Sequence, residues 1–368
     1  MKRIMVVLGT RPEAIKLCPL ILELKKRRRF DVTVCSTGQH GTLLTRALEA
    51  FSVVPDVELP TEAMAGQTCT SQCARILRDL EPILLQSKPD LVLVQGDTAS
   101  AYAAALAAFH LHIPIGHVEA GLRTYRMEAP FPEELYRQSI SLMAKYHFAP
   151  TPHARGNLLR EGKAETAVYL TGNTVVDALK MSLAMPRPRE LREDFPAGAR
   201  PVLFTAHRRE NLGEPMRGMM RALRRLVETY DDLFALCPLH PNPAVREIAK
   251  EEWQGAERIR IIDPPDVIEF HRLLAQSYLV LTDSGGIQEE TVSLGIPTVV
   301  MRYSSERSEG LRTGVLRLAG SGEEGIYSLA ARLLRPGDEE YAAMRKPSRV
   351  FGDGKASCRI ADVLEGIS

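Results

Sequence analysis

The chain contains 368 residues, of which 45% are hydrophobic and 25% are charged, and its formal net charge is +1. This length is enough for two α/β domains, and a nearly neutral chain has no general attraction for nucleic acid or for an anionic membrane surface. We expect neither a signal peptide nor a membrane span, because no apolar run approaches ~18 residues. The six cysteines form no Cys-x-x-Cys pair and no zinc-finger spacing, which indicates a reduced, cytoplasmic protein without a metal site.

The chain begins with an apolar strand, Ile4–Leu8, that runs directly into a helix. Gly9 ends the strand, and Pro12 suits the first turn of the helix, since its missing N–H would have no partner there. Arg11 and Lys16 flank the helix start, where the free backbone N–H groups could bind an anion. A salt-bridged helix cap explains the two basic residues equally well.

Each of the next three strands is also followed by a polar residue. These residues are His40 after the strand 32–36, Asp97 at the end of the strand that begins at Leu91, and Glu119 after a strand near Pro114. An acidic residue in a mainly apolar stretch is costly unless it is paired or functional. Strands that alternate with helices predict a parallel sheet, and ligands bind beyond the carboxyl ends of its strands. We therefore expect these residues and Arg11 to line one cleft.

A Pro-rich segment, Pro130–Arg137, carries two further glutamates. Glu133 and Glu134 fall in the first turn of an expected helix. A carboxylate is favourable at that end of the helix dipole, so both residues also have a purely structural explanation.

We place a domain boundary after residue 172, where Thr171-Gly-Asn-Thr174 interrupts the alternation of strands and helices. The first domain then covers 1–172 and the second covers 173–351. The Pro- and Arg-rich segment 186–201 is the competing boundary, which we interpret as a loop inside the second domain. The second half repeats the layout of the first, with five expected strands and polar residues at their ends.

Two histidines terminate strands in the second half. The strand 201–206 ends in His207-Arg-Arg-Glu-Asn, and three basic groups at a strand end are poor core material but good phosphate partners. We therefore interpret His207 as functional, although a lone histidine is more often structural. For His240, which follows the strand near 233–237, both interpretations stay open.

The most informative stretch is Thr282-Asp-Ser-Gly-Gly-Ile-Gln-Glu-Glu290. A buried strand leads into it, Ser284 is a good N-cap, and the first helical turn offers free N–H groups to an anion. Gly285 and Gly286 have no Cβ atoms to keep a ligand away from the backbone. Glu290 can accept hydrogen bonds from hydroxyl groups. Phosphate and diol binding together indicate a nucleoside diphosphate, whereas a plain strand–Gly–helix turn is the structural alternative.

Seven short motifs are spread over nearly the whole chain. They are Gly9-Thr-Arg-Pro-Glu-Ala-Ile-Lys16, Gly96-Asp-Thr98, His117-Val-Glu-Ala-Gly-Leu-Arg-Thr124, Pro132-Glu-Glu134, His207-Arg-Arg-Glu210, Asp283-Ser-Gly-Gly-Ile-Gln-Glu-Glu290 and Gly352-Asp-Gly354. In this order they resemble the bacterial non-hydrolysing UDP-N-acetylglucosamine 2-epimerases. Any one motif is weakly specific, whereas the ordered set is highly specific.

The resemblance implies a fold and an assembly. The expected fold is α/β and GT-B-like, with two Rossmann-like, doubly wound parallel-sheet domains and an interdomain cleft. A C-terminal helix, here in 352–368, returns to complete the first domain. The family also implies a cytoplasmic homodimer that binds UDP-N-acetylglucosamine and UDP, without a metal or redox cofactor.

The resemblance also assigns roles to individual residues. The catalytic positions are Asp97, Glu119, Glu133 and His207. The UDP-sugar contacts are Arg11, Lys16, Arg137, His207, Phe270, Ser284, Gly285, Gly286 and Glu290, with Glu290 on the ribose. Some family members bind a second UDP-N-acetylglucosamine as an activator, through residues similar to Gln39, Arg208 and His240.

The chain departs from the family pattern in several places. Tyr136 replaces an Asn, and Gly41 stands where an Arg is common. Both changes border the activator region and bear on allostery and on acyl-sugar preference. Ser304-Ser305 replaces a Thr-Thr pair and Ser308 replaces a Pro, while the catalytic positions are intact.

The implied activity is reversible epimerisation at C2 of UDP-N-acetylglucosamine, for cell-surface polysaccharide precursors. Anti elimination of UDP would give a 2-acetamido glycal, and syn re-addition would give the manno epimer. The route needs a base, an acid and cations for the departing diphosphate. Carboxylates supply the first two because crowding and burial separate their pKa values, and Arg11 and His207 supply the third.

Three alternatives share part of this pattern. A GT-B glycosyltransferase usually needs one catalytic base, whereas several carboxylates are expected at the first-domain edge. A hydrolysing epimerase tends to lack the segment that carries Glu133. A non-catalytic UDP-sugar sensor would bind UDP tightly without turnover. A keto intermediate would require nicotinamide, and neither half has a Gly-x-Gly-x-x-Gly turn after a strand.

Overall fold

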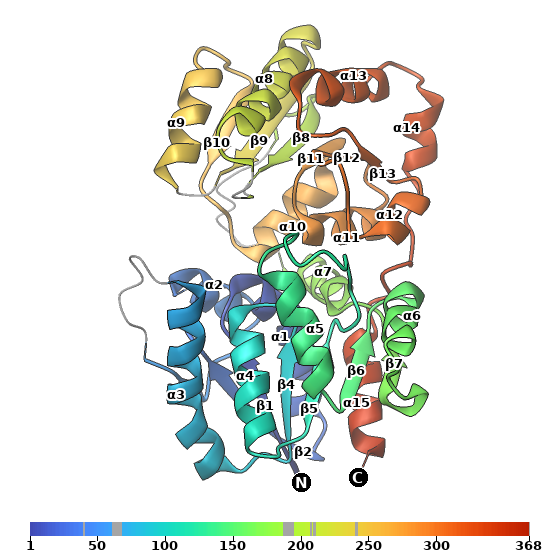
Figure 1. Ribbon diagram of the computed structural model, residues 1–368. Helices are drawn as coiled ribbons and strands as arrows, with labels where there is room; N and C mark the ends of the chain where they lie inside the picture. The colour runs from blue at the N-terminus through green and yellow to red at the C-terminus, as the bar shows by residue number, and fades with distance from the viewer. Residues whose placement is uncertain are drawn as a thin grey trace. The chain divides into compact units, whose positions relative to one another are not determined.

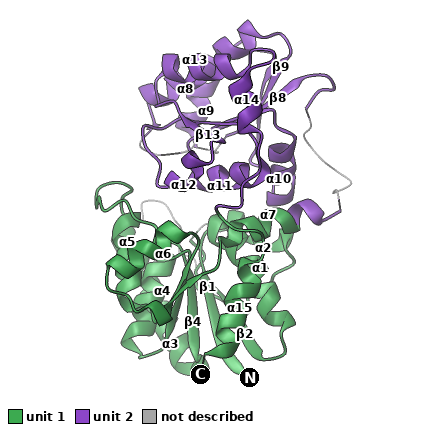
Figure 2. Cartoon of the chain, turned by 90° about the vertical axis from the view of Figure 1, so that its right-hand side faces the viewer, with its two compact units in different colours: residues 1–181, 351–368 green, residues 182–350 purple. Residues whose placement is uncertain are grey.

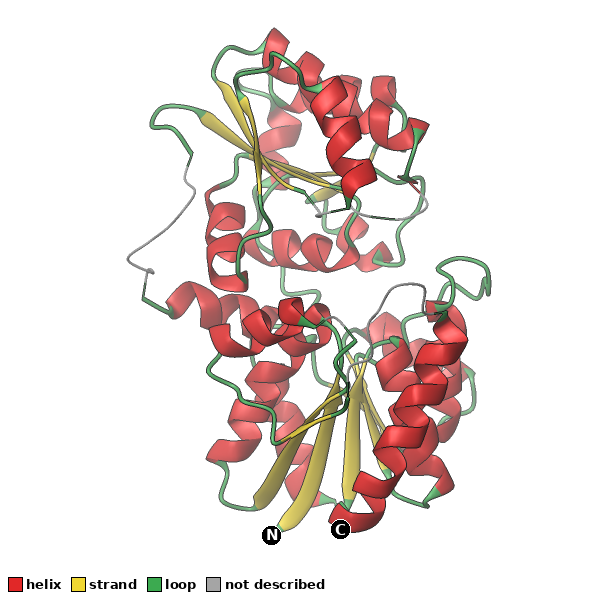
Figure 3. Cartoon of the chain, turned by 90° about the vertical axis from the view of Figure 1, so that its left-hand side faces the viewer, coloured by secondary structure: helices red, strands yellow, loops and turns green. Residues whose placement is uncertain are grey.

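The structure is a computed structural model that describes residues 1–39, 41–60, 68–186, 195–206, 208, 211–239 and 242–367. The chain forms two compact units: unit 1 comprises residues 1–181 and 351–368, and unit 2 comprises residues 182–350 (Figure 2). Each unit is a parallel β-sheet with helices on both faces (Figure 1, Figure 3). None of the helices in the described ranges has the length and apolar character that crossing a membrane requires.

Unit 1 contains a seven-stranded sheet in the order β3-β2-β1-β4-β5-β6-β7. Its strands are β1 (Lys2–Leu8), β2 (Phe30–Ser36), β3 (Val57–Glu58), β4 (Leu91–Gln95), β5 (Ile115–Val118), β6 (Tyr146–Ala149) and β7 (Val168–Leu170). Its helices are α1 (Arg11–Lys26), α2 (Thr42–Ala50), α3 (Cys69–Ser87), α4 (Ala99–His110), α5 (Glu133–Met143), α6 (Pro152–Arg160), the 3-10 helix η1 (Glu165–Ala167) and α15 (Ala356–Gly366); α7 (Thr174–Ala184) leads into unit 2.

Helix α4 shows why one face of this sheet packs closely. Its sequence is Ala-rich, and most of its alanines are completely buried. Small side chains let α4 lie between α3 and α5, where longer side chains would hold the helices apart. Thr98 caps α4 by accepting a hydrogen bond from the N–H of Ala101 at 3.0 Å. The carboxyl end of β4 is therefore followed by a firmly anchored helix start.

Unit 2 contains a six-stranded sheet in the order β10-β9-β8-β11-β12-β13. Its strands are β8 (Arg200–Thr205), β9 (Leu233–Pro238), β10 (Ile259–Ile262), β11 (Leu279–Thr282), β12 (Thr298–Val300) and β13 (Leu316–Leu318). Its helices are α8 (Glu214–Thr229), α9 (Pro243–Glu252), α10 (Val267–Gln276), α11 (Gly285–Leu294), α12 (Ser308–Arg312), α13 (Glu323–Leu333) and α14 (Glu339–Met344).

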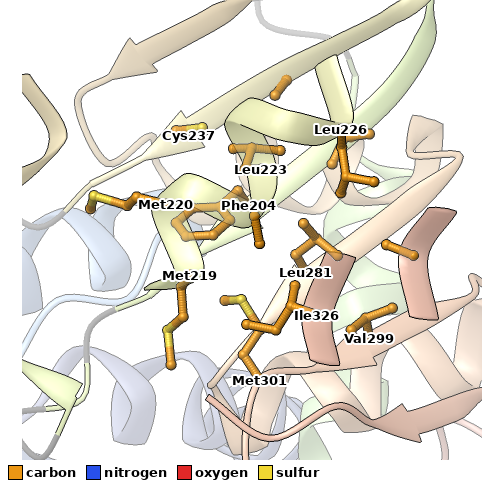
Figure 4. Close-up of a cluster of buried hydrophobic side chains, with 14 of the residues drawn as sticks. Phe204, Met219, Met220, Leu223, Leu226, Cys237, Leu281, Val299, Met301 and Ile326 are labelled. Atoms are coloured by element: carbon orange, nitrogen blue, oxygen red, sulfur yellow. The ribbon is translucent and has the colours of Figure 1, made fainter. Parts of the chain in front are cut away.

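The largest hydrophobic cluster of unit 2 lies between its sheet and helices α8 and α13 (Figure 4). Phe204 on β8 and Leu281 on β11 face this cluster, and Met219, Leu223 and Ile326 approach them from the helices. All five side chains are completely buried. Close packing of this kind holds the two central strands, and therefore their carboxyl ends, in fixed positions.

The expectation of five strands in the second half is wrong by one, because β13 was missed. Leu316–Leu318 has three residues, too few to show the alternation by which a strand is recognised. Tertiary pairing with β12 makes it a strand, through the register Val299↔Arg317 and its neighbours.

The division between the units falls inside α7, whereas the sequence suggested a boundary just before that helix. The first part of α7 belongs to unit 1 because Asp177 binds the start of α15. The Asp177 carboxylate accepts hydrogen bonds from the N–H groups of Ala356 at 3.1 Å and Ser357 at 2.8 Å. The N-cap of α15, Lys355, makes no capping bond of its own, so a carboxylate from another helix satisfies these groups.

We predict that Asp177→Ala destabilises the protein by about 2–4 kcal/mol, because two buried N–H groups of α15 lose their partner. Denaturant unfolding measures the change, and amide hydrogen exchange should accelerate first in α15. Asp362→Ala is the matched control, since Asp362 lies on α15 and pairs with Arg27 at 2.6 Å but has a side chain that is 66% exposed. The control should cost less than about 1 kcal/mol. Equal costs for the two substitutions would contradict the anchoring role of Asp177.

Candidate active site

Both sheets reverse their strand order at one point, and doubly wound sheets bind ligands beyond the carboxyl ends of the strands at such a point. In unit 1 the reversal lies between β1 and β4, and in unit 2 it lies between β8 and β11. Arg11 and Asp97 follow β1 and β4, and Ser284 follows β11. Each unit therefore has a candidate site region at its own reversal point.

In unit 1, donors from three of the described residues hold the side chain of Glu119. Its Oε2 accepts hydrogen bonds from Lys16 Nζ at 2.5 Å, Gln95 Nε2 at 2.9 Å and Asn173 Nδ2 at 3.3 Å. Glu119 is buried and has a φ of +64°, a left-handed conformation that is costly for a residue other than glycine. Such strain is concentrated at functional sites. Lys16, expected to contact an anion, lies against this carboxylate.

Arg137, like Lys16, is a cation that pairs with a carboxylate of unit 1. Its guanidinium contacts Asp97 and lies 3.4 Å from the completely buried Glu134. Glu134 also accepts hydrogen bonds from the N–H groups of residues 124–125, at 3.0 and 2.9 Å, and so holds the turn after β5. Its neighbour Glu133 is half-buried at the first position of α5. Glu134 is therefore structural, whereas Asp97 and Glu133 keep accessible surface.

The turn after β1 is fixed by Glu13, which the sequence did not lead us to expect at the site. Its carboxylate accepts hydrogen bonds from the N–H groups of Gly9 at 3.1 Å and Thr10 at 2.8 Å, and from the hydroxyl of Thr98 at 2.7 Å. Burial raises the pKa of Glu13 to about 6, although these hydrogen bonds oppose the shift. Glu13 thus joins the loops that follow β1 and β4. The Thr10-x-x-Glu13 capping box is the sequence signal that could have identified it.

In unit 2, β11 leads through Asp283 and Ser284 into α11. Ser284 occupies the expected N-cap position, but its side chain makes no capping hydrogen bond. A Cβ atom at Gly286 would meet no atom within 4 Å, whereas a Cβ atom at Gly285 would lie 3.0 Å from the guanidinium of Arg307. The two glycines therefore differ in role: Gly285 makes room for Arg307, and Gly286 leaves the backbone open to a ligand.

Glu290 lies on the same face of α11 as Gly286, one helical turn further on. The residue is 6% exposed, and its Oε2 has no hydrogen-bond partner among the residues that the structure describes. Its Oε1 lies 3.4 Å from Nε2 of His271 on α10. A buried carboxylate oxygen without a partner is costly, so this oxygen is suited to accept a hydrogen bond from a ligand.

Three arginines surround a buried carboxylate beside α11. Glu306 lies 2.6 Å from Arg307, 3.0 Å from Arg302 and 3.6 Å from Arg208. Burial by itself would raise the pKa of Glu306, but the charges of these arginines hold it well below its usual range. Arg307 also binds Glu289 at 2.8 Å. The N-terminus of α11 and the guanidinium donors of these arginines are groups that suit a diphosphate.

Asp283 connects Arg208 and Asn211 to the same turn. Its Oδ2 accepts hydrogen bonds from the N–H of Arg208 at 3.1 Å and from Nδ2 of Asn211 at 2.9 Å. Its backbone carbonyl accepts a further bond from Nε of Arg208 at 3.0 Å. The carboxylate is completely buried, so its role is to hold Arg208 and Asn211 in place.

The remaining expected residues occupy several environments. Arg11 is the first residue of α1 and is half-buried. Phe270 on α10 packs against a hydrophobic cluster under that helix, and Gln39 binds the hydroxyl of Ser100 at 2.7 Å. Three expected histidines lie outside the described residues: His40, His207 and His240.

Known proteins similar to this chain identify its family. The family described as UDP-N-acetylglucosamine 2-epimerase matches residues 22–365. A UDP-N-acetylglucosamine 2-epimerase of Bacillus subtilis is 46% identical over 366 residues, which cover 98% of this chain and 94% of that protein.

Two solved structures are similar over the same length. The S. aureus MnaA–UDP structure is 40% identical, with a TM-score of 0.92, and the match covers 100% of this chain and 96% of that one. The UDP-GlcNAc 2-epimerase from Neisseria meningitidis bound to UDP-GlcNAc is 37% identical, with a TM-score of 0.93 and coverage of 99% and 100%. With the two parallel sheets, these similarities confirm the expected GT-B-like fold class. The chain belongs to the UDP-N-acetylglucosamine 2-epimerase family.

Proposed function

We propose that this chain interconverts UDP-N-acetylglucosamine and UDP-N-acetylmannosamine without hydrolysing the sugar nucleotide. The observation that carries the proposal is the start of α11, where Gly286 leaves the backbone open and Glu290, one helical turn further on, has an oxygen without a hydrogen-bond partner among the described residues. The first suits a phosphate, and the second suits a ribose hydroxyl. Relatives solved with UDP and with UDP-GlcNAc support the same ligand here.

The carboxylates of unit 1 suit the proton transfers at C2. Epimerisation needs one group that removes a proton and one that returns a proton to the other face of the sugar. Glu119 is buried beside Lys16, Asp97 is partly exposed beside Arg137, and Glu133 is half-buried at a helix start. A base and an acid that are both carboxyl groups need different environments to separate their pKa values, and these three residues have such environments.

In the proposed reaction, a carboxylate takes the proton from C2 while the bond between C1 and the diphosphate oxygen breaks. UDP leaves with the electron pair of that bond, and a 2-acetamido glycal remains. A diphosphate oxygen then attacks C1 again while a proton is delivered to C2 from the opposite face, which inverts that carbon. The charge on the departing diphosphate would be stabilised by the start of α11 and its arginines, with Arg11 and His207 assigned by resemblance.

The wider role of the enzyme is part of the same proposal. We place it in the cytoplasm as a homodimer that supplies precursors of cell-surface polysaccharide. Activation by a second UDP-N-acetylglucosamine would use Gln39, Arg208 and His240. The support for these points is the family resemblance.

We predict that Glu290→Gln weakens UDP binding about tenfold or more, because the amide group replaces one charged acceptor with a donor. Isothermal titration calorimetry with UDP measures the change. Glu247→Gln, an exposed site on α9, removes the same charge from the same unit and should leave the affinity unchanged. An unaltered affinity in Glu290→Gln would remove Glu290 from the nucleotide site.

We also predict that turnover in deuterium oxide places deuterium at C2 of both epimers, because the C2 proton is lost and regained during elimination and re-addition. Asp97→Asn, Glu119→Gln and Glu133→Gln should each lower turnover by ~10²–10⁴-fold while UDP still binds. Nuclear magnetic resonance of the product mixture reports both the label and the rate.

The matched control for these variants is Glu128→Gln, because Glu128 is an exposed glutamate shortly before α5. It should turn over and incorporate label as the unaltered chain does. Epimer formed without label at C2 would exclude the elimination route.

A further inference from the structure

A chain of buried polar side chains leads from the Glu290 carboxylate on α11 through α10 to helix α7. Oγ of Ser182, on α7, lies 2.5 Å from Nδ1 of His271, on α10. The other ring nitrogen, Nε2, lies 3.4 Å from Oε1 of Glu290, on α11. Ser182 is 0% exposed, His271 1% and Glu290 6%. Polar groups at this depth lose their hydration, so their arrangement has to be maintained by their mutual contacts.

The neighbours of the imidazole determine which nitrogen carries the hydrogen. An ionised carboxylate only accepts hydrogen bonds, so Nε2, which faces Glu290, carries the hydrogen. With the hydrogen on Nε2 of a neutral ring, Nδ1 is an acceptor, and the hydroxyl of Ser182 at 2.5 Å has the hydrogen to donate to it. Glu290 thereby determines the tautomer, and the contact with Ser182 fixes the orientation of the ring.

The contact between His271 and Glu290 is longer than a normal hydrogen bond. Its 3.4 Å exceeds the usual 2.7–3.2 Å, and neither Nε2 of His271 nor Oε2 of Glu290 has a hydrogen-bond partner in the described part of the chain. Contacts of this kind in unliganded sites often shorten when a ligand binds. Glu290 lies one helical turn beyond Gly286 on α11, where a Cβ atom would meet nothing within 4 Å, so a ligand at this face of the helix would lie near the carboxylate.

We propose that His271 is a positioning residue that orients the Glu290 carboxylate toward the two ribose hydroxyls, and that Ser182 orients His271. This role rests on the proposed function, because it needs a nucleotide at the start of α11. A carboxylate held at one oxygen presents a fixed pair of acceptors to adjacent hydroxyls, whereas an unheld carboxylate must be ordered when the ligand binds. The three residues together make the site selective for a ribose over a deoxygenated sugar.

The test compares UDP with 2′,3′-dideoxy-UDP, which keeps the base and the diphosphate but lacks the diol. His271→Ala should weaken UDP binding about tenfold, the effect of one charge-assisted hydrogen bond, and leave the affinity for the dideoxy nucleotide within about twofold. The ratio of the two affinities should therefore shrink about tenfold. A packing defect at this buried position would lower the affinities for both nucleotides by the same factor.

Two amide variants separate positioning from packing. His271→Gln places an amide nitrogen near the position of Nε2 and should restore most of the selectivity. His271→Asn places its amide near Nδ1, cannot reach Glu290, and should behave like His271→Ala. Thermal melting of each variant shows whether it is folded.

Ser182→Ala should reduce the selectivity by about threefold, since the ring keeps Nε2 but loses the partner that orients it. It should have no further effect in the His271→Ala background, because Ser182 acts through His271. Ser293→Ala is the matched control, since that hydroxyl on α11 binds the carbonyl oxygen of Glu289 at 2.8 Å. The control should keep the full affinity ratio.

If His271→Ala lowered the affinities for UDP and for 2′,3′-dideoxy-UDP by the same factor, the positioning role would be overturned. The positioning role would also be overturned if His271→Asn restored the affinity ratio as well as His271→Gln does. Absence of UDP binding by the unaltered chain is a separate result, which would overturn the proposed function and the positioning role with it.

Discussion

A parallel sheet brings the carboxyl ends of all its strands to one edge, and this constraint organises both units. The central strands, β1 in unit 1 and β8 in unit 2, have a neighbour on each side, and the strand order reverses beside each of them. Where the strand order reverses, the loops that follow the two adjacent strands run to opposite faces of the sheet. This leaves space between the two loops. Glu13 and Asp283 hold loops at these points, so the candidate site depends first on the topology.

Buried carboxylates in this protein fall into two groups that differ in how completely they are paired. Glu134 is bound by backbone N–H groups, and Glu306 is surrounded by arginines. Such groups hold turns and neighbouring side chains in place, since a buried charge requires partners. Glu290 differs because one of its buried oxygens has no partner among the residues described. Buried polar groups without a partner are few in native structures, and this contrast distinguishes Glu290 from the other buried carboxylates more clearly than its burial does.

Helix α7 contributes to both units through different residues. Asp177 anchors the start of α15 in unit 1, and Ser182 contacts His271 in unit 2. Both are small polar residues on an otherwise mainly apolar helix, so neither stands out as functional in the sequence. Their roles come from what packs against them, at separations of 179 and 89 residues along the chain.

Local patterns in the sequence were sufficient for the fold class and for part of the site. The alternation of apolar strands with helices predicted two parallel sheets, and the structure confirms them. The Ser284-Gly-Gly286 turn was placed correctly between a strand and a helix, because N-cap and glycine preferences act over a few residues. The ordered motifs indicated the family, which the full-length matches confirm. The roles of the individual site residues stay predictions.

Only the tertiary structure decided which charged groups lie together. Lys16 and Arg137, which are predicted to contact the substrate, lie against Glu119 and Asp97, and the first pair is 103 residues apart in sequence. Gly285, which is predicted to contact a ligand, also leaves room for the guanidinium of Arg307. Helix and strand preferences depend on residues that are close together in the chain, so they can be recognised from the sequence. Ion pairs between distant residues depend on how the layers pack, which a single sequence does not encode in any local pattern.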